Sequence, residues 1–68
     1  MKLNKKLSQF LKKTRLAVGL TQDQAASELG YTSPQFISNW ERGLASPPAK
    51  ILYNLAKLYK VNPEHLFE

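Results

Sequence analysis

Apolar residues recur along most of the chain at intervals of three and four positions, which is the spacing of one face of an α-helix. The first stripe has four members one or two helical turns apart, namely Leu3, Leu7, Leu11 and Val18. Gly19 follows directly, and glycine is a common terminator of helices. The pattern predicts a first helix over about residues 3–18.

The stretch "LTQDQAASELG" predicts a second helix over about residues 22–29. Thr21 can cap its N-terminus, and Gln24, three residues later, can reach back to complete a capping box. Gly30 ends this helix, and only a short turn separates it from the next apolar stripe.

A third helix is predicted over about residues 34–42. Ser33 is a favourable N-cap, and Pro34 is suited to the first helical position, where its missing N–H is not needed. Ile37 and Trp40 follow at helical spacing and would face a core, leaving the other side of this helix polar.

The turn "LASPP" follows Gly43 and leads into a fourth helix over about residues 49–60. Its broad apolar face comprises Ile51, Leu52, Leu55, Ala56, Leu58 and Tyr59. Asn62 and Pro63 repeat the cap-plus-proline pattern and predict a last helix over 63–67 that buries Leu66. With no strand pattern, we expect an all-α fold: one compact domain of five short helices over residues 1–68.

Composition excludes several classes of site. The chain has no cysteine and one histidine, so it can form neither a disulfide nor a thiolate metal site, and we expect no metal and no cofactor. No apolar run approaches the ~20 residues of a membrane span, which favours a soluble, cytoplasmic protein without a membrane partner. No nucleophile–base–acid set or glycine-rich phosphate loop is visible, so we expect no enzyme activity.

Positive charge is concentrated at one end of the sequence. The formal net charge is +5, but residues 1–20 contain six Lys and Arg and no acid, whereas residues 61–68 contain two Glu and no Lys or Arg. Such a basic segment favours binding to a polyanion. The alternative is that these lysines form an ordinary solvated helix face.

Two adjacent short helices joined by a tight turn form a helix-turn-helix pattern, in which the second helix can project into a DNA groove. The outward positions of the third helix would be Gln35, Phe36, Ser38 and Asn39, with Arg42 one turn later. An amide side chain matches the N6 and N7 atoms of adenine, and an aromatic ring can contact a thymine methyl group. Taken singly, each of these residues is more often an ordinary surface residue, with Phe36 partly buried. Taken together, beside a basic first helix, they favour a base-reading face.

Two charged residues stand where helical spacing calls for apolar ones. Arg15 follows Leu11 by one turn, and Glu41 follows Ile37 by one turn. An unpaired buried charge is costly, so we predict that Arg15 and Glu41 form an ion pair that fixes the third helix against the first.

With these motifs, "LTQDQAASELG", "SPQFISNWERG" and "SPPAKILYNLAKLYKVNPEHLF", the chain resembles the Cro/phage-repressor type of helix-turn-helix family over about residues 7–67. The resemblance implies a prokaryotic or phage-encoded regulator that binds double-stranded DNA at a near-palindromic operator, usually as a homodimer, with the third helix in the major groove. It assigns base reading to the positions of Gln35, Ser38 and Asn39. Phosphate contacts are expected from Gln22, Ser33, Arg42, Lys50 and Lys6.

One departure from the family concerns the turn. Gly43 follows Gly30 by thirteen positions, one more than is common, so the turn holds an extra residue and Pro34 falls where relatives often have a base-reading amide. Base reading should therefore shift to Gln35 and Asn39.

Self-association and a rival function remain open from the sequence. Candidate dimer contacts are Tyr53, Leu66 and Phe67, where the local charge is not positive. The rival is a small basic protein-interaction module, antitoxin-like or an anti-regulator partner, in which the amides of the third helix are ordinary surface. Salt-dependent binding to DNA separates the two readings.

Overall fold

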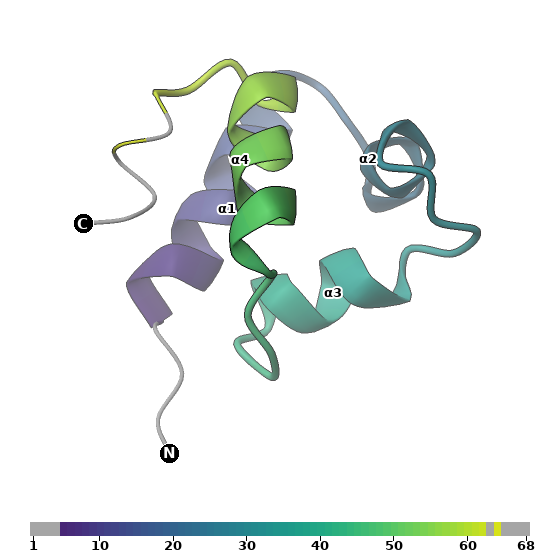
Figure 1. Ribbon diagram of the computed structural model, residues 1–68, viewed down its shortest axis with the longest axis horizontal. Coiled ribbons are helices and arrows are strands. Elements are labelled where there is room, and N and C mark those ends of the chain that lie inside the picture. Colours follow the sequence, from purple (N-terminus) through teal and green to yellow (C-terminus); the bar gives the residue numbers. More distant parts are fainter. Residues whose placement is uncertain (1–4, 63, 65–68) are drawn as a thin grey trace.

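The computed structural model describes residues 5–62 and residue 64, and these form four α-helices (Figure 1). The helices are α1 (Lys5–Ala17), α2 (Gln22–Glu28), α3 (Gln35–Glu41) and α4 (Ala49–Leu58). No strand occurs among the described residues. The prediction of an all-α fold is therefore confirmed.

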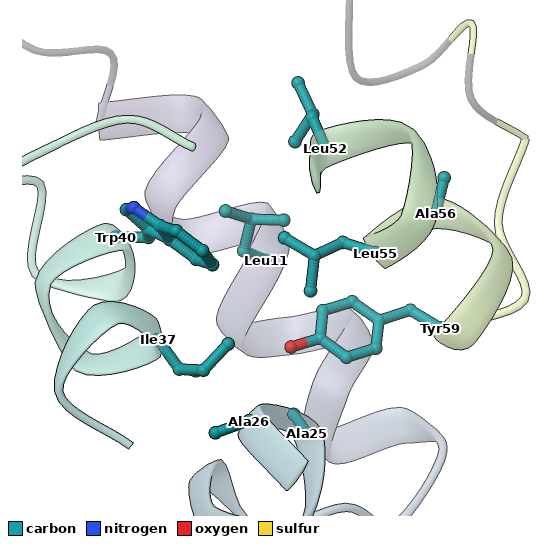
Figure 2. Close-up of a cluster of buried hydrophobic side chains, with 9 residues drawn as sticks. All are labelled: Leu11, Ala25, Ala26, Ile37, Trp40, Leu52, Leu55, Ala56 and Tyr59. Carbon is teal, nitrogen blue, oxygen red and sulfur yellow. The ribbon is translucent and has the colours of Figure 1, made fainter. Parts of the chain in front are cut away.

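The core is one cluster of buried apolar side chains to which all four helices contribute (Figure 2). Its members are Leu11, Ala25, Ala26, Ile37, Trp40, Leu52, Leu55, Ala56 and Tyr59. Ala25 and Ala26, the two adjacent alanines of α2, are fully buried. Their small side chains allow neighbouring segments to pack close to the axis of this helix. α3 packs against both α1 and α2, so the core holds the helix-turn-helix in place.

The start of α2 follows the predicted chemistry. Thr21 Oγ1 accepts the N–H of Gln24 at 3.0 Å, and Gln24 Oε1 accepts the N–H of Thr21 at 2.8 Å. This reciprocal pair is a complete capping box, as predicted. At the other end of the helix Gly30 adopts a φ of +86°, a left-handed conformation that strains any residue with a Cβ.

The start of α3 differs from the prediction. The helix begins at Gln35 rather than Pro34, and Pro34 occupies the cap position, where no side chain caps the helix. Ser33 is therefore not the N-cap. Its Oγ accepts only a long hydrogen bond of 3.4 Å from the N–H of Gln35. The cause is the backbone of Pro34, whose ψ of 5° departs from helical values and belongs to the turn.

The end of α4 needs correction, and the predicted last helix falls almost entirely outside the described residues. α4 stops at Leu58, two residues earlier than predicted, because Lys60 takes a left-handed φ of 60°. The described residues contain four helices and not five. The predicted helix over 63–67, with the expected burial of Leu66, lies outside the described residues except for Glu64.

Candidate nucleic-acid interface

Arg15 and Glu41 form the predicted ion pair between α1 and the end of α3. The Nε of Arg15 lies 2.6 Å from Oε2 of Glu41, and its Nη2 donates to Oε1 at 3.0 Å, so the contact is bidentate. Both side chains are almost fully covered, with 7% and 3% of their surface exposed. The pair therefore fixes the rotation and height of α3 relative to α1.

Further groups complete the surroundings of this pair. Arg15 Nη1 donates to the carbonyl of Leu20 at 2.8 Å, and the side chain of Gln22 donates to Oε1 of Glu41 at 3.1 Å. The hydrogen-bonded carboxylate of Glu41 raises the pKa of Arg15, and burial partly opposes this increase. Glu41 thus connects α1, α2 and α3, and the described residues contain no buried side-chain polar atom without a partner.

Tyr59, the residue that directly follows α4, lies in the core (Figure 2). Its phenol interacts electrostatically with both Glu41 and Arg15. Burial, reinforced by the negative charge of Glu41 and weakened by the positive charge of Arg15, raises the pKa of Tyr59 to about 12. The phenol of Tyr59 therefore keeps its proton to a higher pH than an ordinary tyrosine.

The opposite side of α3 carries polar side chains, which we call the α3 polar face: Gln35, Ser38, Asn39 and Arg42. The side-chain nitrogen of Gln35 donates to Oδ1 of Asn39 at 3.0 Å. Arg42 Nη2 donates to the same oxygen at 2.9 Å. The positions i, i+4 and i+7 of one helix bring these three groups together. Gln35 and Arg42 are exposed, whereas Ser38 and Asn39 are half-buried.

An aromatic cluster borders the α3 polar face. The rings of Tyr31 and Phe36 are 4.9 Å apart between centroids, and each lies 6.0 Å from the ring of Trp40. Trp40 is buried, but Phe36 remains 53% exposed. This exposure leaves the ring accessible, and its contact with a thymine methyl group stays a prediction. Sequence reasoning missed Tyr31, which supports this ring from the turn.

Basic side chains flank α3 at one end of the molecule. Figure 1 places the first turns of α1 and α4 at the end where α3 lies. Lys6 is in the first turn of α1 and Lys50 is the second residue of α4, and both are exposed. A Cβ on Gly43 would lie 3.6 Å from Ser8 Oγ, so the end of α3 approaches the early part of α1. Arg15 does not belong to this basic surface because Glu41 neutralises it.

The other predicted positions are spread more widely. Gln22 is half-buried and turned toward Glu41, and Ser33 is exposed in the turn before α3. Tyr53 is exposed on α4, where the ammonium of Lys57 lies 5.2 Å from its ring centroid. Leu66 and Phe67, the other dimer candidates, lie outside the described residues.

The described part of the chain lacks two kinds of feature. No group of three or more His, Cys, Asp or Glu residues there could hold a metal ion. None of the helices there is long and apolar enough to cross a membrane.

The short helices α2 and α3 pack against each other across a turn, as in a helix-turn-helix, and a helix-turn-helix family model matches residues 11–66. The chain belongs to the Cro/C1-type helix-turn-helix family. Among solved structures it is similar to a protein from Bacteroides fragilis that is described as a candidate DNA-binding protein. The two share 26% sequence identity, with a TM-score of 0.74 over 94% of each chain. A comparison with curated proteins gave no match.

Proposed function

We propose that this helix-turn-helix protein is a sequence-specific regulator that binds double-stranded DNA with α3 in the major groove. It acts as a repressor by occupying an operator and needs no chemical step or cofactor. Family membership and the DNA-binding description of the similar Bacteroides protein support binding to DNA.

The observation that carries the proposal is the two-sided character of α3. Ile37 and Trp40 are buried on one side, and the Arg15–Glu41 pair anchors the end of the helix. On the other side the α3 polar face carries amide, hydroxyl and guanidinium groups, of which the side chains of Gln35 and Arg42 are exposed. These are the side chains that contact base edges in the major groove, where each base pair has its own pattern of donors and acceptors.

Phosphate contacts would set the register of the protein on the duplex. Lys6 in the first turn of α1, Lys50 near the start of α4 and Arg42 at the end of α3 are exposed and supply positive charge. Ser33 lies just before α3, and Gln22 still has a second amide proton beyond the one given to Glu41. Such contacts are independent of sequence and account for most of the salt dependence of binding.

Homodimer formation on DNA belongs to the proposal, because one small domain contacts few base pairs. Two copies related by a two-fold axis would place their α3 helices about 34 Å apart and would read a near-palindromic operator. Tyr53, exposed on α4, is the candidate contact within the described residues. Sedimentation of the protein with operator DNA should show two copies per duplex, and a single copy on every duplex would contradict this part of the proposal.

Titration of random-sequence duplex DNA, followed by fluorescence anisotropy, tests DNA binding itself. Three cationic phosphate contacts predict binding about 40-fold weaker at about 200 mM than at about 50 mM monovalent salt. Repeated selection from a random pool should then enrich one near-palindromic sequence. Absence of binding even at low salt would overturn the proposal and favour the rival, a basic module that binds an acidic protein.

A further inference from the structure

The hydrogen bonds on the α3 polar face determine which way both amides point. A guanidinium group can only donate, so the atom of Asn39 that meets Arg42 must be the side-chain oxygen. That oxygen also receives the contact from Gln35, so the facing atom of Gln35 must be its nitrogen. The donor-only chemistry of Arg42 thus sets the orientation of Asn39, and Asn39 sets the orientation of Gln35.

This arrangement leaves the two amides with different roles. Oδ1 of Asn39 already accepts two hydrogen bonds, so Asn39 keeps only amide protons and, while these bonds persist, cannot offer a base an acceptor beside a donor. Gln35 is exposed and keeps its oxygen and one amide proton for an external group. An acceptor next to a donor is the arrangement that adenine matches with N6 and N7.

We propose that Asn39 is a positioning residue that presets the Gln35 amide for adenine, and that it does not read a base of its own. The inference rests on the proposed DNA-binding function and deepens it by naming the base and the residue that sets the preference. It replaces the prediction from sequence that Asn39 is itself a base reader.

The chemical consequence is discrimination between the two purines. Guanine presents two acceptors, O6 and N7, in the major groove, where adenine presents a donor and an acceptor. A freely rotating amide can turn its NH2 group toward the acceptors of guanine. When Asn39 holds the Gln35 amide, the amide oxygen faces O6 of guanine. Both atoms are acceptors, so no proton is available for a hydrogen bond between them.

The test uses base preference measured site by site on an operator obtained by selection. The position read by Gln35 is identified as the one whose preference disappears in Gln35→Ala. Asn39→Ala should reduce the preference for adenine over guanine at that same position by about 10-fold. Asn39→Asp keeps an acceptor for both Gln35 and Arg42, so it should retain the preference while its negative charge weakens binding to all duplexes alike.

A double-mutant cycle and a control complete the design. Adding Asn39→Ala to Gln35→Ala should cause no further change at the position read by Gln35. Asn54→Ala removes a half-buried asparagine from α4 and should leave base preference unchanged. Circular dichroism of each variant checks that the four helices persist.

Three outcomes would overturn the inference. Asn39→Ala could relax a different base position, additively with Gln35→Ala, which would make Asn39 a base reader. It could change no position at all, or Asn39→Asp could lose the adenine preference. Failure of the proposed function is distinguishable, because wild-type protein would then select no sequence. The side-chain amide protons of Gln35 in free protein should lose their hydrogen-bonded NMR shift in Asn39→Ala and keep a hydrogen-bonded shift in Asn39→Asp, which tests the positioning step without DNA.

Discussion

Arg15 and Glu41 occupy positions where helical spacing alone calls for apolar side chains. Their burial costs free energy of desolvation, which the bidentate contact and the bond to the Leu20 carbonyl offset. Such a pair contributes little net stability, but removing one partner leaves a buried charge alone. Its main effect is therefore on geometry, since it holds α3 against α1.

Glu41→Gln should lower the free energy of unfolding by about 3 kcal/mol, because the buried guanidinium of Arg15 loses its counter-charge. Urea unfolding followed by the fluorescence of buried Trp40 measures the change. Glu28→Gln, the same substitution at an exposed position of α2, is the control and should change stability by less than about 0.5 kcal/mol. Equal effects of the two variants would show that the pair is not buried in solution.

The raised pKa of Tyr59 predicts that the folded protein loses stability in alkaline solution. Its pKa is about 12 in the folded protein and about 10 in the unfolded chain. Between these values the unfolded chain has released the phenolic proton and the folded protein still holds it, so rising pH favours unfolding. The free energy of unfolding should fall by about 2–3 kcal/mol from pH 10 to pH 12 and be unaffected by this group below pH 10.

Urea unfolding at a series of pH values measures this loss. Tyr59→Phe should remove that part of the decrease, whereas Tyr53→Phe, at an exposed site, should retain it. The same alkaline decrease in wild type and Tyr59→Phe would assign it to other groups, such as the lysines.

At the scale of single residues, some side-chain contacts could be predicted from the sequence and others could not. The Arg15–Glu41 pair was predictable because each charge interrupts an apolar stripe. The contact from Gln35 to Asn39 was not predicted, although a spacing of four on one helix allows it. Its direction depends on the third member, Arg42, whose approach to Asn39 is a matter of side-chain conformation rather than of pattern.

Among the elements, the turn between α2 and α3 controls how the polar face is presented. Gly30 takes a φ of +86° there, and no atom lies within 4 Å of the place where a Cβ would be. Backbone conformation, and not crowding, therefore requires glycine. Gly30→Ala should cost about 1–2 kcal/mol of stability.

Thermal unfolding of variants at position 30 tests whether backbone conformation, and not crowding, causes the loss of stability. Gly30→Asn should cost less than Gly30→Ala, because asparagine tolerates the left-handed region better. Crowding would instead make the larger asparagine the more damaging substitution, so the reverse order would contradict the account.

Helix ends were predictable where a residue type has one strong preference. Three glycines with positive φ, at 19, 30 and 43, follow α1, α2 and α3, and the Thr21–Gln24 capping box starts α2. The start of α3 was misplaced by one residue because Ser33 and Pro34 suit a helix start and a turn equally well. The end of α4 was misplaced because Lys60 adopts a left-handed conformation, which is rare for lysine. The sequence pattern around Lys60 gives no sign of this conformation.

For the whole molecule, the arrangement of elements converts a scattered set of charges into a basic surface. The formal net charge of +5 says nothing of direction, and one of the six basic residues near the N-terminus is neutralised internally. The first turns of α1 and α4 lie at the end of the molecule where α3 lies because the helices fold around one core (Figure 1). Sequence reasoning supplied the residues of this surface, and the packing supplied their proximity.

The central claim is a division of labour between the α3 polar face and the surrounding lysines. Binding of wild type, Gln35→Ala and Lys50→Ala to the selected operator and to a scrambled duplex, at one salt concentration, tests it most directly. Gln35→Ala should reduce the ratio of the two affinities by about 10-fold or more with little change on scrambled DNA, and Lys50→Ala should weaken both duplexes alike. The account is contradicted if both variants change the ratio equally.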